Sequence, residues 1–94
     1  MALYLRKVIH PQAQENYRVI LKLNGSEFEI GSIGIQHNGW SWGIDTPIPI
    51  RALETQGEGK DRGDCMRQFK AAWDRFAADE ANLTEFLNAK RRRR

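Results

Sequence analysis

Cysteine and histidine are scarce in this 94-residue chain, and each shortage removes a class of protein. The only cysteine is Cys65, and the two histidines are His10 and His37. A lone cysteine forms no internal disulfide, so the disulfide framework of small secreted domains is excluded. One cysteine and two histidines at no recognised spacing also make no zinc site. We therefore expect a protein without a metal or other cofactor, in a reducing cytoplasm.

Long apolar runs are missing as well, so we expect no segment that spans a membrane. The stretch Met1 to Ile9 lacks the basic-then-apolar order of a secretory leader, and His10-Pro11 follows it without a small-residue cleavage site. What is present argues for folding: hydrophobic residues make up 40% of the chain, and three of its residues are tryptophan. A chain of this length predicts one domain.

Positive charge is concentrated at the C-terminal end. The formal net charge is +3, from 15 Lys and Arg against 12 Asp and Glu. Lys90–Arg94 holds five of the positive charges, which leaves 10 against 12, or −2, for residues 1–89. A domain that wraps nucleic acid usually has a basic face of its own, and residues 1–89 indicate none. We divide the chain into a single domain at 1–89 and a basic tail at 90–94.

Two Asn-Gly dipeptides, Asn24-Gly25 and Asn38-Gly39, organise the middle of the chain. Each lies between alternating apolar residues, the strongest short-range signal for a two-residue hairpin turn. In succession they predict a three-stranded antiparallel meander. The predicted cross-strand pairs are Lys22–Glu27, Leu21–Phe28 and Val19–Ile30 in the first hairpin, and His37–Trp40, Ile35–Trp42 and Ile33–Ile44 in the second.

The shared middle strand changes phase near its centre. Its apolar residues are even-numbered at Phe28 and Ile30 but odd-numbered at Ile33 and Ile35. A pattern of period two changes phase only where a residue is inserted, so we predict a β-bulge at Gly31-Ser32. The bulge brings nine apolar side chains onto one face: Val19, Leu21, Phe28, Ile30, Ile33, Ile35, Trp40, Trp42 and Ile44.

The opposite face of the second hairpin carries small residues. Gly34 is expected to face Gly43, beside Ser32 and Ser41. Such residues permit the close approach of another backbone or a flat ligand, and a solvated, tightly twisted face is the ordinary alternative.

The flanking segments are less regular. Leu3–Ile9 alternates loosely and is a candidate fourth, edge strand. Thr46–Ile50 contains two prolines and cannot continue a central strand, because each proline removes a ladder donor. The polar stretch Arg51–Gly63 is predicted to be a long loop, and loops of this length are either functional or mobile.

An amphipathic helix is predicted over Asp64–Ala78, with Asp64 as its N-cap. Its apolar stripe of Met66, Phe69, Trp73 and Phe76 should cover the apolar sheet face. The stripe resumes later, and there either the helix continues or Asn82 caps a second one. The resumed stripe, which could line a core or a dimer interface, consists of Leu83, Phe86 and Leu87.

These elements give the fold class α+β: a three-stranded antiparallel meander, with a candidate fourth edge strand, packed on one face by a C-terminal helix. Three strings of the sequence together resemble a group of small bacterial proteins that are themselves uncharacterised. The likeness covers about residues 17–94 and implies an intact single-domain protein, with no activity, cofactor or catalytic residue to carry over. The strings are Glu29–Gln36 (EIGSIGIQ), Trp40-x-Trp42-x-Ile44-Asp45 and Asp64–Trp73 (DCMRQFKAAW).

The best candidate for chemistry is the glycine-rich segment Gly57–Gly63, which runs into the predicted helix. A helix N-terminus presents free N–H groups, and Lys60 and Arg62 would add positive charge for a phosphate. The segment does not match a P-loop, however, because Glu54 replaces the first glycine and Asp61 replaces the Ser or Thr. An ordinary loop is the better interpretation.

No catalytic residue is predicted. Cys65 in the first helical turn would feel a dipole that favours its thiolate, but a nucleophile also needs a base, and neither histidine is placed near it. The carboxylates are scattered over turns and the polar helix face and form no diagnostic pair. We therefore predict that the protein is not an enzyme.

Two features could bind nucleic acid. The three tryptophans would form a stacking platform only if the sheet face were open, and covering by the helix stripe favours a core instead. The basic tail could hold phosphates without sequence choice, or be a solvated chain end. Its candidate contact residues are Lys90, Arg91, Arg92, Arg93 and Arg94.

The leading functional prediction is a small, non-enzymatic, cytoplasmic interaction or accessory module with a protein partner. The alternative is a nucleic-acid-binding module that uses the sheet face or the tail. Three strands and a helix are similar in layout to plant ethylene-response DNA-binding domains and phage integrase arm-binding domains, in which the free sheet face enters the major groove; this is an analogy of fold alone. Here that face would offer two basic and three acidic side chains: Arg18, Lys22, Glu27, Glu29 and Asp45.

Overall fold

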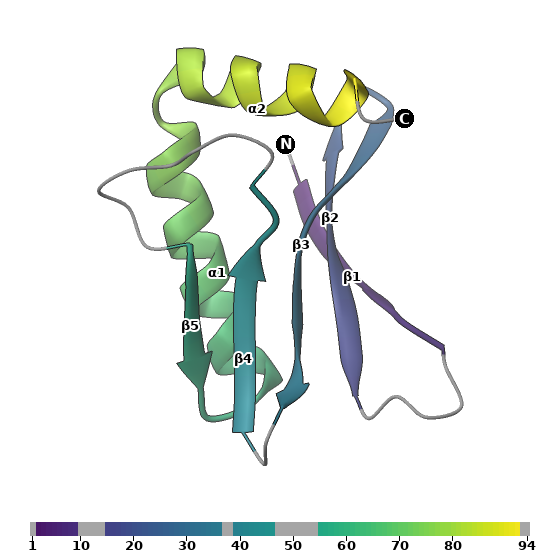
Figure 1. Ribbon diagram of the computed structural model, residues 1–94, viewed down its shortest axis with the longest axis vertical. Helices are drawn as coiled ribbons and strands as arrows, with labels where there is room; N and C mark the ends of the chain where they lie inside the picture. The colour runs from purple at the N-terminus through teal and green to yellow at the C-terminus, as the bar shows by residue number, and fades with distance from the viewer. Residues whose placement is uncertain (1, 10–14, 37–38, 47–54, 93–94) are drawn as a thin grey trace.

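Each strand of the sheet pairs with its neighbour in sequence, so the chain forms one antiparallel meander (Figure 1). The computed structural model describes residues 2–9, 15–36, 39–46 and 55–92. The sheet has the order β1-β2-β3-β4-β5, and two helices follow it. The elements of the described residues are β1 (Ala2–Lys7), β2 (Asn16–Leu23), β3 (Ser26–Gln36), β4 (Gly39–Ile44), β5 (Gln56–Gly59), α1 (Arg62–Ala77) and α2 (Glu80–Arg92).

The predicted α+β class is confirmed, but its details need correction, since the described residues form five strands and two helices instead of three or four strands and one helix. The candidate edge strand at Leu3–Ile9 is present as β1. The predicted loop at Arg51–Gly63 is wrong for Gln56–Gly59, which pairs with β4 as β5, and for Arg62 and Gly63, which begin α1. Residues 51–54 of that loop lie outside the described residues. The sequence Gln-Gly-Glu-Gly contains no apolar residue, so alternation of hydrophobicity could not reveal this strand.

The two glycines of β5 show why it lies where it does. A Cβ on Gly57 would stand 2.8 Å from the indole Nε1 of Trp42, and a Cβ on Gly59 would stand 2.7 Å from the sulfur of Cys65. Only glycine allows β4 and α1 to approach the strand this closely. Packing against these side chains, rather than strand propensity, therefore selects β5.

The first hairpin follows its predicted register near the turn. Lys22 pairs with Glu27, and Leu21 pairs with Phe28. Asn24 and Gly25 have φ of 51° and 82°, the positive values that a type I′ turn requires. The local turn chemistry therefore fixes this register.

The predicted β-bulge is present, one residue earlier than expected. The register of β2 against β3 shifts between Val19 and Ile20, whose partners are Gly31 and Glu29. Ile30 is thus the inserted residue, and the predicted pair Val19–Ile30 is wrong. Because the insertion still comes before Ile33, the change of phase along β3 is as predicted.

The second hairpin is offset by two residues from the prediction. The observed pairs are Ile35–Trp40, Ile33–Trp42 and Gly31–Ile44. Residues 37 and 38 lie outside the described residues, so the predicted pair of His37 with Trp40 and the first residue of the predicted Asn38-Gly39 turn do as well. A slip of two residues leaves every side chain on its original face, because the side-chain period of a strand is two.

The apolar sheet face and the helices form one core. Trp42 is buried in the cluster with Leu21 and Phe28, and Trp40 packs against it, so the prediction that these side chains share a face is confirmed. Ile35 pairs with Trp40 on the predicted face but is outside the core cluster. Seven of the nine residues of the predicted face are buried: Val19, Leu21, Phe28, Ile30, Ile33, Trp42 and Ile44.

Helix α1 lies behind β3, β4 and β5 in Figure 1 and covers their apolar face. Its buried residues are Cys65, Phe69, Ala72, Trp73 and Phe76.

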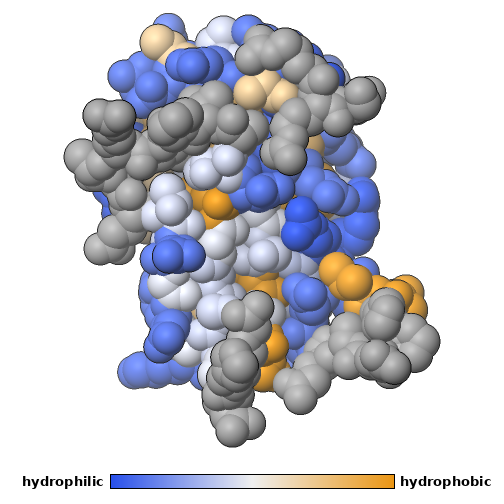
Figure 2. Space-filling view, viewed as in Figure 1, coloured by the Kyte–Doolittle hydropathy of each residue, from blue (hydrophilic) through white to orange (hydrophobic). Residues whose placement is uncertain are grey.

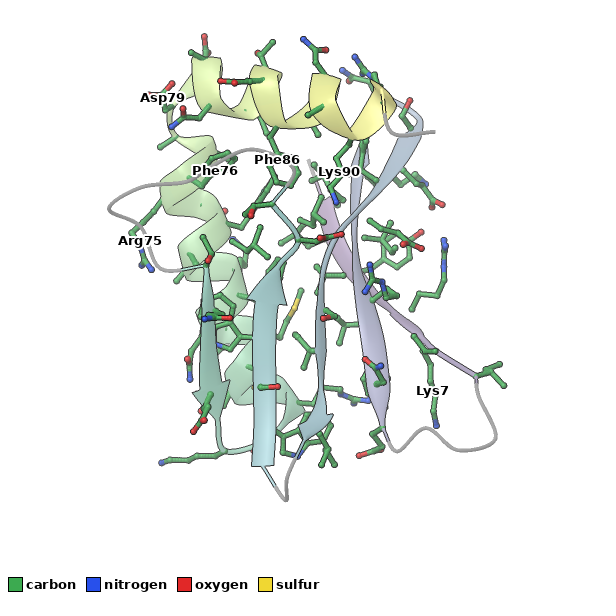
Figure 3. All side chains as sticks on the ribbon, in the orientation of Figure 1. Lys7, Arg75, Phe76, Asp79, Phe86 and Lys90 are labelled. Carbon is green, nitrogen blue, oxygen red and sulfur yellow. The ribbon has the colours of Figure 1, made fainter. Side chains whose placement is uncertain are left out.

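Helix α2 is separate from α1 and completes the core. The Asp79 carboxylate accepts a hydrogen bond from the backbone N–H of Asn82 at 3.1 Å, so the cap of α2 is Asp79 and not the predicted Asn82. Phe86 projects from α2 toward Phe76 (Figure 3), and their ring centroids lie 5.5 Å apart. Phe86 also meets Trp73 edge-on at 5.2 Å. The second apolar stripe therefore belongs to the core of the monomer.

Candidate binding surface on the open sheet face

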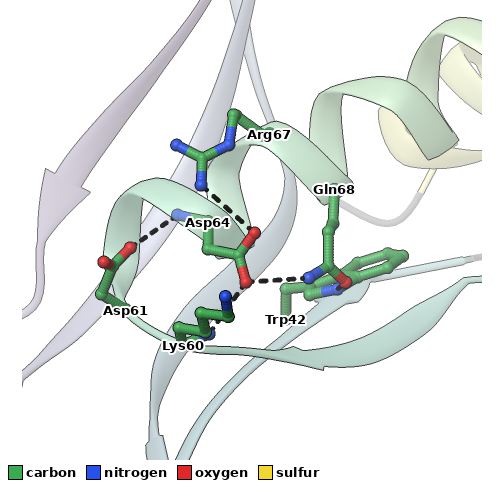
Figure 4. A network of polar contacts seen from close by, with 6 residues as sticks. All are labelled: Trp42, Lys60, Asp61, Asp64, Arg67 and Gln68. Atoms are coloured by element: carbon green, nitrogen blue, oxygen red, sulfur yellow. Dashed lines mark hydrogen bonds and ion pairs between the residues drawn. The ribbon is translucent and has the colours of Figure 1, made fainter.

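The first turn of α1 holds a polar network at the place predicted for an anion (Figure 4). Asp61, not the predicted Asp64, is the N-cap, and its Oδ1 accepts the Asp64 N–H at 2.7 Å. The Asp64 carboxylate accepts the Lys60 N–H at 2.9 Å, which holds the pKa of Asp64 below its usual value. It also accepts hydrogen bonds from Gln68 and Arg67, at 3.2 and 3.3 Å. An incoming anion would therefore meet two carboxylates at this helix end.

Two other residues predicted for chemistry at this end are also engaged. The Arg62 guanidinium donates to the Tyr17 hydroxyl at 2.9 Å and lies over the Tyr17 ring, 5.0 Å from its centroid. Cys65 is fully buried, and this burial, with the nearby charges of Asp64 and Asp61, raises the pKa of its thiol. The thiol therefore stays protonated near neutral pH, and Cys65 acts as a small core residue.

The basic C-terminal segment begins inside α2 rather than after it. Lys90 is largely buried, forms an ion pair with Asp45 at 3.0 Å, and lies 5.6 Å from the ring centroid of Phe86. The Arg91 guanidinium lies 5.4 Å from the centroid of the Phe28 ring. Arg92 ends the helix, and residues 93 and 94 lie outside the described residues. Two of the five candidate nucleic-acid contacts thus attach α2 to the sheet.

The sheet face away from the helices divides into two halves, and the half over β1 to β3 is covered by paired charges. Arg6 bonds to Glu27 at 3.0 Å, and the Tyr4 hydroxyl bonds to the same carboxylate. That hydrogen bond raises the pKa of Tyr4 and lowers the pKa of Glu27. Arg18 lies 3.5 Å from Glu29 and 3.9 Å from Asp45. The arginine expected to serve a DNA groove is therefore already paired with acidic side chains.

The other half of this face, over β3 to β5, is hollowed. The hollow has a volume of about 600 Å³. In Figure 2 the centre of this face is pale, the colour of intermediate hydropathy, and hydrophilic side chains flank it. The residues that line the hollow are Asn16, Ser32, Gly34, Ile35, Ser41, Trp42, Gly43, Gln56, Gly57 and Glu58.

The floor of the hollow is largely bare backbone. A Cβ on Gly43 would meet nothing closer than 3.9 Å, so the space above this residue is open. The second hairpin brings Gly34 opposite Ser41 and Gly43 opposite Ser32, instead of the two glycines opposite each other. The four small residues noted in the sequence therefore line the hollow together, with each glycine paired to a serine.

The rim of the hollow includes three residues to which the sequence assigned no binding role. Gln56 escaped notice because β5 was not predicted, and Asn16 because it lies at the start of β2, before the apolar pattern begins. Glu58 entered only as an acidic residue of the segment Gly57–Gly63 that opposes phosphate binding. The one available signal was the alternation of polar residues with Gly57 and Gly59. This alternation indicates a strand only when the packing of Trp42 against Gly57 is known.

The tryptophans do not form a stacking platform on this face. Trp73 is 1% exposed and Trp42 is 5% exposed, and both belong to the core. The Trp42 indole Nε1 donates to Gln68 of α1 at 2.9 Å, which turns the ring toward the helix (Figure 4). The prediction of a tryptophan core is confirmed for these two residues.

Within the described ranges, no group of three or more His, Cys, Asp and Glu residues is arranged to hold a metal ion. Neither described helix has the length and apolar character needed to cross a bilayer. Comparisons with protein-family models, curated proteins and solved structures found no match. The resemblance to small bacterial proteins therefore stays a prediction.

Proposed function

We propose that this chain is a non-enzymatic binding module whose contact surface is the open face of β3, β4 and β5. The observation that carries the proposal is the hollow of about 600 Å³ on that face, opposite the face that α1 covers. Small-ligand and side-chain pockets have volumes of about 300–1,000 Å³. The partner we expect is a protein segment that lays one or two side chains into the hollow, in a cytoplasmic setting.

The composition of the hollow supports binding rather than catalysis. Glu58 is the only titratable residue among the described lining residues, and no described lining residue is a histidine, lysine or cysteine, the usual activating bases and thiol nucleophile. Cys65, the other candidate nucleophile, is buried in the core. The proposed role is therefore recognition.

A selection of displayed peptides against the folded protein tests this proposal. Selected peptides should bind the wild type and lose about tenfold or more in affinity with Gly43→Val, which fills the hollow. The added side chain has room, since the nearest atoms to a Cβ on Gly43 are 3.9 Å away. Thr84→Val on exposed α2 is the matched control and should change nothing. Peptides that bind both variants like the wild type, or that shift amide resonances only outside β3 to β5, would contradict the proposal.

The alternative is nucleic-acid binding through the basic end of α2. Its support is the run of cations from Lys90 to Arg94. Against it stand the ion pair of Lys90 with Asp45 and the stacking of Arg91 on Phe28, which tie both side chains to the folded domain. Binding of this kind would be weak and indifferent to base sequence, because phosphate contacts carry no sequence information.

A further inference from the structure

Polar side chains that bond to no other described side chain surround the hollow. Asn16, Ser32, Ser41, Gln56 and Glu58 come from all four strands β2 to β5, and each carries a side-chain oxygen. The Asn16 Oδ1 atom lies over the floor, 3.1 Å from where a Cβ on Gly34 would stand. The hollow therefore presents hydrogen-bond acceptors to whatever enters it.

Among the described residues, the hollow carries a negative charge that no cation compensates. Glu58 forms no ion pair within the described residues, and no described lining residue is a cation. The carboxylates on the other half of this face behave differently, since Glu27 pairs with Arg6 of β1 and Glu29 pairs with Arg18 of β2. Glu58 has no such partner among the described residues, and its charge at the hollow favours a cationic ligand and disfavours a phosphate.

The shape of the hollow distinguishes between cations. The floor at Gly43 lacks a side chain and is open, so a flat group can lie against the backbone there. Gly34 is already covered by Asn16 and by the backbone oxygen of Glu15. A guanidinium is planar, carries five N–H donors and has no acceptor, which matches a flat floor ringed by oxygens. A lysine ammonium is a compact point charge with three donors and fits this arrangement less well.

We propose that the hollow binds the arginine side chain of a partner peptide. The inference rests on the proposed function, that this face is a contact surface, and it adds the chemistry of the partner. The guanidinium lies flat over Gly43 and donates to Glu58 and to the amide and hydroxyl oxygens of the rim. Charge-assisted hydrogen bonds to the carboxylate supply most of the discrimination.

The test is a titration of the full chain with three acetylated, amidated pentapeptides, Gly-Gly-X-Gly-Gly, in which X is arginine, lysine or citrulline. Citrulline keeps the shape of arginine without its charge. The arginine peptide should bind best and shift the amide resonances of β3 to β5, the lysine peptide should bind several-fold more weakly, and citrulline should bind about tenfold more weakly or not at all.

Matched variants assign the binding to the hollow. Glu58→Gln should weaken the arginine peptide about tenfold, whereas Glu85→Gln on exposed α2, which makes the same charge change, should not. Gly43→Ala should also weaken binding of the arginine peptide, because its methyl group enters the hollow, whereas Gly63→Ala at the start of α1 should leave this binding unchanged. The two variants are matched, since neither added methyl group meets an atom closer than 3.5 Å.

Three results would overturn the arginine inference: equal binding of the arginine and citrulline peptides, equal effects of the two glutamate variants, and selected peptides that occupy the hollow without an arginine. The last of these leaves the proposed function intact. If neither the selected peptides nor the arginine peptide perturbs β3 to β5, the contact surface itself is wrong.

Discussion

Gly31→Ala should destabilise the protein strongly, because this glycine is where β3, β4 and α1 meet. A Cβ on Gly31 would stand 2.5 Å from Cε2 and 2.7 Å from Cζ of Phe69, and closer still to the carbonyl oxygen of Gly43. Neither neighbour can withdraw easily. Phe69 is fully buried and meets Trp42 edge-on at 6.0 Å, and Gly43 lies in β4, between β3 and β5. The substitution therefore forces α1 away from the sheet at the bulge.

The size of the effect follows from these distances. Carbon atoms pack at about 3.5–4.0 Å, so the Phe69 ring has to move by roughly 1 Å. Inserting a methyl group into a packed core costs about 1–3 kcal/mol. In a domain of this size each 1 kcal/mol lowers the melting temperature by about 4–8 °C, so we expect a decrease of roughly 4–24 °C. Thermal unfolding followed by circular dichroism and by tryptophan fluorescence measures it.

Gly43→Ala, on the adjacent strand, is the matched control. Its Cβ points into the open hollow, with nothing closer than 3.9 Å, so the melting temperature should stay the same or rise. If Gly31→Ala melts within about 2 °C of Gly43→Ala, α1 does not pack on the bulge as described. The arrangement of the core would then need revision.

Four further predictions concern the core, the first turn of α1 and the basic end of α2. Trp73→Ala removes a fully buried indole and should cost about 3–5 kcal/mol in chemical denaturation; a melting temperature within a degree or two of the parent would contradict this. The lowered pKa of Asp64 contributes stability that is present above pH about 4 and is lost as the pH falls. Asp64→Asn should therefore lower the free energy of unfolding more at pH 7 than at pH 3. An equal loss at both pH values would refute this. Removing residues 90–94 should abolish low-salt binding of a labelled DNA duplex, and sequence-selective binding by the shortened chain would favour the sheet face instead. Asp45→Asn should strengthen duplex binding more than Asp74→Asn, because it alone frees a lysine of that segment, and equal effects would mean that the ion pair does not limit binding.

Features determined within a few neighbouring residues were predictable from the sequence. Asn24-Gly25 adopts the positive φ values of a tight hairpin, and this turn alone fixes the nearest cross-strand pairs. The bulge was predictable because the change from even to odd apolar positions has one geometric cause. The stripe around Phe69 and Trp73 indicated α1 because helical spacing places such residues on one face.

Features determined by contacts between distant segments were not predictable. The predicted register of the second hairpin, with Asn38-Gly39 as its turn, is two residues away from the observed one, in which Gln36 pairs with Gly39. Both registers put the same side chains on the same face of the sheet. The sequence pattern therefore could not distinguish the two registers. We infer that the contacts of Trp42 with Phe69 and Gln68 of α1 select the observed register.

The candidate site depends most on the tertiary structure. The sequence indicated small residues at Gly34 and Gly43, but they surround a hollow only because β5 forms beside them. β5 in turn forms because Trp42 packs on Gly57 and the first turn of α1 packs on Gly59. Local propensity opposes a strand with two glycines, and burial of large side chains against that bare backbone outweighs it.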